Sequence, residues 1–74
     1  MLWFYTRGEE DLELVTRYDS RTAEYVLTVF WADGHHQEER FTAGSQFRAR
    51  LLELEGRLAA DRWAIDGPPK FFAE

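Results

Sequence analysis

The residues best suited to chemistry stand together at His35-His36, followed by two carboxylates at Glu38-Glu39. Imidazole and carboxylate groups are common ligands of transition metals. On a β-strand, His36 and Glu38 share one face while His35 lies on the other, so this spacing brings only two ligands together. A stable metal site needs three or four ligands. We therefore expect a solvated hairpin here, with no metal and no other cofactor.

The remaining nucleophiles and acids form no catalytic arrangement. Ser20 and Ser45 lack the glycine-flanked elbow that exposes the nucleophile of serine hydrolases. The carboxylate pairs at 9–10 and 38–39 fall on an expected surface turn and an expected edge strand. The sequence also has no glycine-rich loop of the kind that holds phosphates. We expect that the protein is not an enzyme.

Aromatic side chains offer another chemistry, the stacking of nucleic-acid bases. The chain has three Trp, three Tyr and six Phe residues, but its net charge is −5 and its basic residues are scattered singly. Binding to phosphates needs a positive patch, so we do not expect nucleic acid as the main partner. A domain that binds single-stranded nucleic acid on an aromatic sheet surface remains the alternative hypothesis. Its candidate residues are Trp3, Tyr5, Phe30 and Trp31, with Arg7 and Arg17 nearby.

The length of the chain limits how much core it can bury. With 74 residues, one domain covering 1–74 is expected, and a domain of this size often gains stability by forming oligomers. No cysteine is present, so no disulfide can assist. No apolar run approaches the roughly 20 residues that cross a bilayer, and no signal peptide precedes the first expected strand. We expect no membrane association and a cytoplasmic location.

Hydrophobic periodicity predicts an α+β fold, a four-stranded antiparallel β-meander followed by one C-terminal helix. The Asp33-Gly34 pair is a preferred two-residue type I′ turn, which requires positive φ at both residues. Trp63 extends the apolar stripe of the helix, and the Gly-Pro-Pro at 67–69 cannot continue it. We expect strands at about 2–7, 12–18, 23–32 and 36–41, the helix at about 43–63, and an extended tail at 66–74.

Strand pairing assigns these side chains to two faces. A two-residue turn pairs Trp31 with His36 and Leu27 with Arg40. One face of the sheet then carries Trp3, Tyr5, Leu12, Leu14, Tyr18, Tyr25, Leu27, Val29 and Trp31. The other face carries Leu2, Phe4, Val15, Val26, Thr28, Phe30 and Phe41, beside Glu13 and Arg17, so neither face is polar.

One helix can cover only one face of such a sheet. A helix is about 10 Å across, whereas four strands spaced about 4.8 Å apart span roughly 15 Å or more. An uncovered apolar face usually marks an interaction site, and a second copy of the chain is its simplest occupant. We therefore predict a non-catalytic protein-interaction module, a homodimer or the binder of an unknown protein. The candidate interface residues are Phe4, Val15, Val26, Phe30 and Phe41, although the sequence leaves open which face is outward.

Six short stretches carry a resemblance to known proteins: WFYTRG, EYVLTV, the Asp33-Gly34 turn, ERF, FRARLLELEGRL and the tryptophan before GPP. Over these stretches, which span nearly the whole chain, the sequence resembles a group of small uncharacterised bacterial proteins. The resemblance implies a shared fold and brings no activity or site residue with it. In the order of its elements the chain is also similar to a PUR repeat, a nucleic-acid-binding unit that dimerises.

Overall fold

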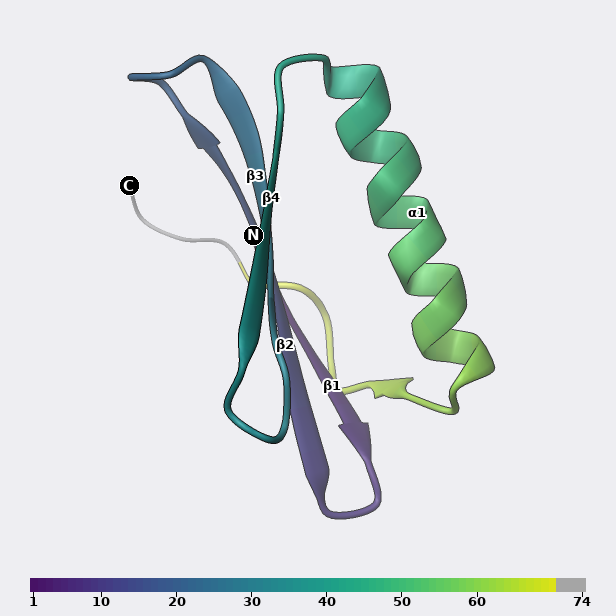
Figure 1. Ribbon diagram of the computed structural model, residues 1–74. Coiled ribbons are helices and arrows are strands. Elements are labelled where there is room, and N and C mark those ends of the chain that lie inside the picture. The colour runs from purple at the N-terminus through teal and green to yellow at the C-terminus, as the bar shows by residue number, and fades with distance from the viewer. Residues whose placement is uncertain (71–74) are drawn as a thin grey trace.

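The predicted α+β meander is confirmed, with a fifth short strand added. A computed structural model describes residues 1–70 and shows one antiparallel sheet with α1 lying across one of its faces (Figure 1). The sheet order is β4-β3-β2-β1-β5. The elements are β1 (Leu2–Arg7), β2 (Glu10–Asp19), β3 (Glu24–Phe30), β4 (His36–Phe41), α1 (Gly44–Ala60) and β5 (Ala64–Ile65). Within the described residues, no helix has the length and apolar character needed to cross a membrane.

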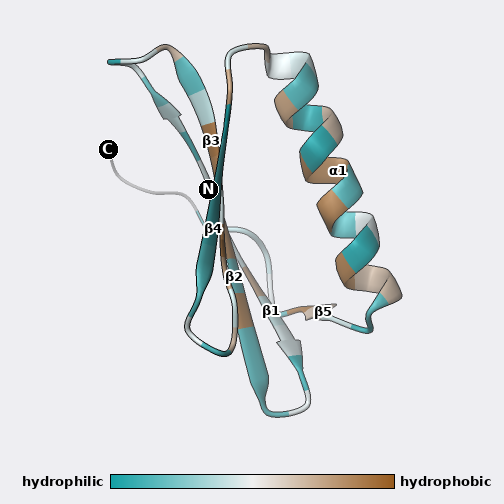
Figure 2. Cartoon of the chain, in the orientation of Figure 1, coloured by the Kyte–Doolittle hydropathy of each residue, from teal (hydrophilic) through white to brown (hydrophobic). Residues whose placement is uncertain are grey.

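The core lies between α1 and one face of the sheet. Trp3 pairs with Leu14 and Tyr5 with Leu12, so these side chains share this covered face, as predicted for the face and not for the pairing. Apolar and polar positions alternate along α1 in the manner of a helix with one buried side (Figure 2). The buried core residues are Tyr5, Leu12, Leu14, Leu27, Val29, Leu54, Leu58 and Trp63.

The turn between β3 and β4 differs from the predicted one. Residues 32–34 lie between Trp31 and His35, whose backbones are joined by a hydrogen bond of 2.9 Å, and the Gly34 N–H donates to the Trp31 carbonyl. Gly34 alone in this turn has positive φ, at 95°. This is the arrangement of a three-residue hairpin loop, in which glycine takes the left-handed position after a β-turn. The prediction of a two-residue turn with Asp33 at positive φ was therefore wrong.

The longer turn shifts the register of β4 by one residue. Phe30, not Trp31, pairs with His36, and Leu27 pairs with Glu39 instead of Arg40. A shift of one residue moves every side chain of a strand to the opposite face. Phe41 consequently lies opposite Tyr25 and packs against the core beneath α1.

The helix ends three residues earlier than predicted, at Ala60. Arg62 adopts φ 66°, its N–H donates to the Ala59 carbonyl, and the Trp63 N–H donates to the Leu58 carbonyl. These two hydrogen bonds and the left-handed residue make a Schellman motif, with Trp63 and Leu58 in the apolar contact that usually accompanies it. Trp63 therefore reaches the core from beyond the helix.

The segment after the helix returns to the outer edge of β1. Ile65 pairs with Tyr5 and Ala64 with Thr6, forming β5, which the sequence did not predict. Farther on, Leu2 and Lys70 exchange two backbone hydrogen bonds of 2.7 and 2.8 Å. The part of the predicted tail at 71–74 lies outside the described residues.

Gly34→Val should lower the free energy of unfolding by about 1 kcal/mol or more, because a β-branched residue is strained at positive φ. Urea denaturation of the wild type and the variant measures this difference. Asp33→Gly is the matched control for the turn type. This variant should not raise the free energy of unfolding, since Asp33 does not have positive φ. A higher free energy of unfolding would instead favour the two-residue turn.

Arg62→Gly should raise the free energy of unfolding by about 1 kcal/mol, because glycine adopts the left-handed conformation without the strain of a Cβ atom. Arg48→Gly, at an exposed position inside α1, should instead lower it by about 1 kcal/mol. Thermal or urea denaturation compares the three proteins. Equal losses in both variants would contradict the Schellman ending.

Candidate interaction surface

The face of the sheet that α1 does not cover, here called the open face, carries one apolar patch. Its members are Leu2, Phe4, Val15 and Phe30. Leu2 lies directly opposite Val15, while Phe4 and Phe30 flank Glu13 from the two neighbouring strands. Each ring is thus a diagonal neighbour of Val15, within the roughly 7–8 Å that aromatic side chains bridge. Phe30 is 42% exposed, and the other three are partly buried.

Val26 lies on the open face but is not accessible. It is 0% exposed, although no part of α1 lies on this side of the sheet. Its cross-strand neighbours are Arg17 on one side and Arg40 on the other. The aliphatic stems of long basic side chains readily cover apolar surface while their charged ends stay in water. We infer that the two arginines seal Val26 against solvent.

A network of ion pairs holds these arginines in place across three strands. At its centre is Asp19, whose side chain is 8% exposed. Its Oδ2 accepts a hydrogen bond of 3.2 Å from Arg40 Nη1, and its Oδ1 accepts one of 3.1 Å from the Arg21 backbone N–H. Arg40 also donates to Glu38 at 2.9 Å and to Glu24 at 3.4 Å. The end of the open face near Asp19 is therefore charged and internally paired.

The hydrogen bond from Arg40 is the largest influence on Asp19, and it lowers the pKa of this carboxyl group. The hydrogen bond from the Arg21 backbone acts in the same direction, while burial opposes both. Asp19 is therefore ionised at neutral pH. As a carboxylate it accepts hydrogen bonds from the Arg40 side chain and the Arg21 backbone, and it forms an ion pair with Arg17 at 3.8 Å.

The five candidate interface residues do not share one accessible surface. Phe4, Val15 and Phe30 lie together in the apolar patch. Val26 lies on the same face but is sealed. Phe41 was assigned to the wrong face, because the three-residue turn places it opposite Tyr25, and its ring lies 6.2 Å from that of Phe47 on α1.

The four aromatic candidates for base stacking are also divided. Trp3, Tyr5 and Trp31 belong to or pack against the core under α1, and only Phe30 is on the open face. The charged residues on the open face are acidic more often than basic: Glu13, Asp19, Glu24 and Glu38 against Arg17, Arg40 and, at the outer edge, Lys70. An aromatic and basic platform for single strands is therefore not assembled on this face.

The two histidines lie on different sides of the hairpin. His36 stacks on Phe30 at 5.6 Å between ring centres and borders the apolar patch, whereas His35 stacks on Trp31 at 5.7 Å. Among residues 1–70, no group of three or more histidine, cysteine or acidic side chains is arranged to hold a metal ion.

Two charges at the patch remain without an ion pair among the described residues. Glu13 stands between Phe4 and Phe30, and Lys70 lies at the outer edge with its Nζ 5.2 Å from the centre of the Phe4 ring. Neither residue belongs to an ion pair within 1–70. The sequence did not indicate Lys70, because only the return of segment 66–70 to β1 brings it here.

Comparison with known proteins gives no relative from which a role follows. No protein-family model matches the chain, and no match was found among curated proteins or solved structures. The arrangement of the side chains is therefore the only basis for a functional proposal.

Asp19→Asn should lower the free energy of unfolding at neutral pH, because it removes the ionised acceptor of Arg40. The pKa of Asp19 is lowered in the folded state, so its carboxylate stabilises the protein above the unfolded pKa of about 3.9. That contribution is lost as the pH falls through the lower pKa of the folded state. Urea denaturation at several pH values should show the two proteins converging below about pH 4.

Glu9→Gln, in the exposed turn between β1 and β2, is the control for a general loss of negative charge. Its stability should follow that of the wild type at each pH. A difference between wild type and Asp19→Asn that stays constant down to about pH 2 would contradict the role of the ionised carboxylate.

Proposed function

We propose that the protein is a non-catalytic interaction module that pairs with a second copy of itself through the open face of the sheet. The observation that carries this proposal is the apolar patch of Leu2, Phe4, Val15 and Phe30, on the face that α1 leaves uncovered. The lack of cysteine is compatible with a reducing compartment, and we place the dimer in the cytoplasm.

The size of a stable interface decides how much of the open face takes part. A standard interface buries about 800 Å² per partner, which is roughly 15% of the 5241 Å² exposed by this chain. Four side chains do not supply that area, so the interface includes the charged residues beside the patch. Such a surface has the usual anatomy of an interface, an apolar centre with a polar rim.

Glu13 and Lys70, which form no ion pair within 1–70, favour a second copy as the occupant. In a two-fold dimer, each surface patch meets the same patch of the partner. Glu13 of one copy and Lys70 of the other copy then both lie in the shared interface. Burying Glu13 without a partner would be costly, whereas pairing it with a lysine offsets that cost. One acidic and one basic residue at the same patch make it complementary to itself.

The oligomeric state tests the proposal directly. Analytical ultracentrifugation at micromolar concentration should give twice the chain mass of 8.8 kDa for the wild type. Phe30→Glu should shift the protein to monomer, because it places a charge in the apolar centre of the interface. Phe30 is 42% exposed in the single chain, so the variant should keep its fold.

Leu52→Glu is the matched control. Leu52 is the most exposed large apolar side chain on α1, at 61%, and it lies away from the open face. The same substitution there should leave the dimer intact. A folded wild type that sediments as a monomer would refute the proposal, and so would equal dissociation of both variants.

A further inference from the structure

A pocket of about 190 Å³ lies at the end of the core where α1 stops, on the covered side of the sheet and away from the apolar patch. Three segments far apart in the sequence form it: the β1–β2 hairpin, the turn between β3 and β4, and the residues that follow α1. It is lined by Arg7, Glu10, Trp31, Ala32, Asp33, His35, Asp61 and Trp63. Drug-sized ligands occupy roughly 300–1,000 Å³, so this pocket suits a group of only a few heavy atoms.

One wall of the pocket is already occupied by an internal cation. The guanidinium of Arg7 lies 4.5 Å from the centre of the Trp63 ring. Arg7 also donates to Glu10 at 3.1 and 3.2 Å and to the carbonyl oxygen of Asp61 at 3.1 Å. Its positive charge is therefore paired with a carboxylate and fixed against an indole.

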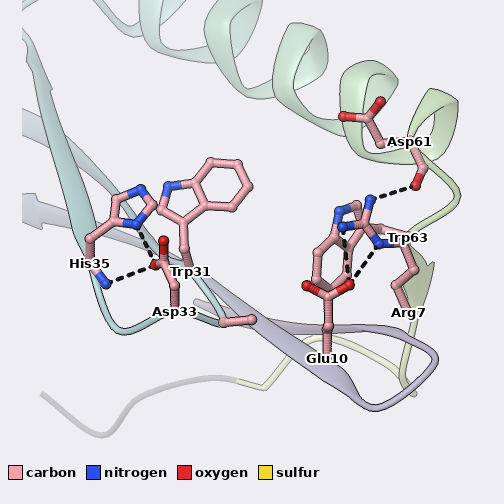
Figure 3. A pocket seen from close by; sticks show the side chains of 8 residues that line it. Arg7, Glu10, Trp31, Asp33, His35, Asp61 and Trp63 are labelled. Atoms are coloured by element: carbon pink, nitrogen blue, oxygen red, sulfur yellow. Dashed lines mark hydrogen bonds and ion pairs between the residues drawn. The ribbon is translucent and has the colours of Figure 1, made fainter.

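The opposite wall has an indole with no cation on it. Figure 3 shows Trp31 with His35 on one side and, across the pocket, the Arg7–Trp63 pair. Within 1–70, Arg7 and Lys70 lie over the rings of Trp63 and Phe4, and no arginine or lysine lies over Trp31, which has His35 stacked on one side. The Nε1–H of Trp31 is buried and has no hydrogen-bond partner among these residues. A ligand in the pocket can therefore contact the π surface of Trp31 but not its Nε1–H donor.

A carboxylate stands beside this indole. Asp33 Oδ1 accepts hydrogen bonds from the backbone N–H and the ring of His35, and none of the hydrogen bonds among the described residues uses Oδ2. The backbone hydrogen bond from His35 is the main cause that lowers the pKa of Asp33, so this group is ionised at neutral pH. Of the acidic residues in the lining, Glu10 is paired with Arg7 and Asp61 contributes its backbone carbonyl. Asp33 is therefore the carboxylate beside the indole, which favours cations over anions as ligands.

We propose that this pocket binds a small organic cation, an alkylated ammonium group placed over the indole of Trp31 and beside the carboxylate of Asp33. Tryptophan is the strongest aromatic partner of such cations, and a neighbouring carboxylate supplies the balancing charge. The cation can belong to a free amine or to the side chain of a methylated lysine. This proposal does not depend on the dimer, because the pocket and the open face lie on opposite sides of the sheet.

Titration by NMR tests the site with tetramethylammonium chloride as the probe. The indole N–H signal of Trp31 should shift in a saturable way, beyond any shift caused by sodium chloride at equal ionic strength. Tert-butanol, which has nearly the same shape and no charge, should cause no comparable shift. A second titration with acetylated trimethyllysine amide distinguishes the two sources of the cation. If this compound binds more tightly than tetramethylammonium, the ligand is a protein side chain. If it binds more weakly, the ligand is a free amine.

Two substitutions locate the site. Trp31→Leu should weaken binding of tetramethylammonium about tenfold or more. In this variant the titration is read from the indole N–H signal of Trp63. Asp33→Asn should also weaken it, whereas Asp66→Asn makes the same change at an exposed residue outside the pocket and should not. The spectra themselves report whether each variant is folded. The proposal fails if tert-butanol binds as well as tetramethylammonium, if no saturable shift occurs, or if the two Asp variants respond alike.

Discussion

The turn at residues 32–34 determines what each face of the sheet presents, because it sets the register of β4. With three residues in the turn, Phe41 and Glu39 face α1, where Phe41 packs near Phe47 and Glu39 accepts hydrogen bonds from Arg50 at 3.0 and 3.2 Å. The same register turns Arg40 to the open face, within reach of Asp19. A shift of one residue would break both sets of contacts at once. The core beneath α1 and the charged network on the open face therefore depend on one backbone conformation at Gly34.

The open face is better described as two halves than as a uniform apolar surface. Near Asp19, arginine stems bury Val26 and the charges are satisfied within the chain. Toward Phe30 and Phe4, the rings are 42% exposed and partly buried respectively, and Glu13 has no ion-pair partner among the described residues. The first half holds three strands together and the second is available for association. A partner that meets this face gains mostly from the second half.

The parts of the fold that the sequence predicted are those with a strong strand composition and a short turn. In β1 and β2, counting residues outward from the hairpin turn assigned the faces, and the structure agrees at Trp3, Tyr5, Leu12 and Leu14. In β4 the residues before Phe41 are all polar, so nothing in their pattern distinguishes one register from the next. The Asp-Gly pair fits a two-residue turn and also the end of a three-residue one. The placement of Phe41 among the interface candidates failed for this reason.

The end of the helix and β5 were missed for different reasons. Arg62 takes a left-handed conformation that glycine usually occupies, so its residue type gave no signal, and Trp63 continued the apolar spacing of α1. A strand as short as β5 has no periodicity to detect, and its partner, β1, stands at the other end of the chain. The pocket beside Trp31 was missed for a related reason, since its walls come from segments that only the folded chain brings together.

The return of the chain to β1 also has a consequence for how the protein folds. Sheet neighbours from β4 to β1 follow one another in sequence, so each hairpin forms by closing a short loop. The pairing of Tyr5 with Ile65 instead closes almost the whole chain, at a larger cost in conformational entropy and for only a two-residue strand. We expect this closure to form last during folding and to open first in native-state hydrogen exchange. The outer edge of β1 would then be exposed transiently while the other hairpins remain intact.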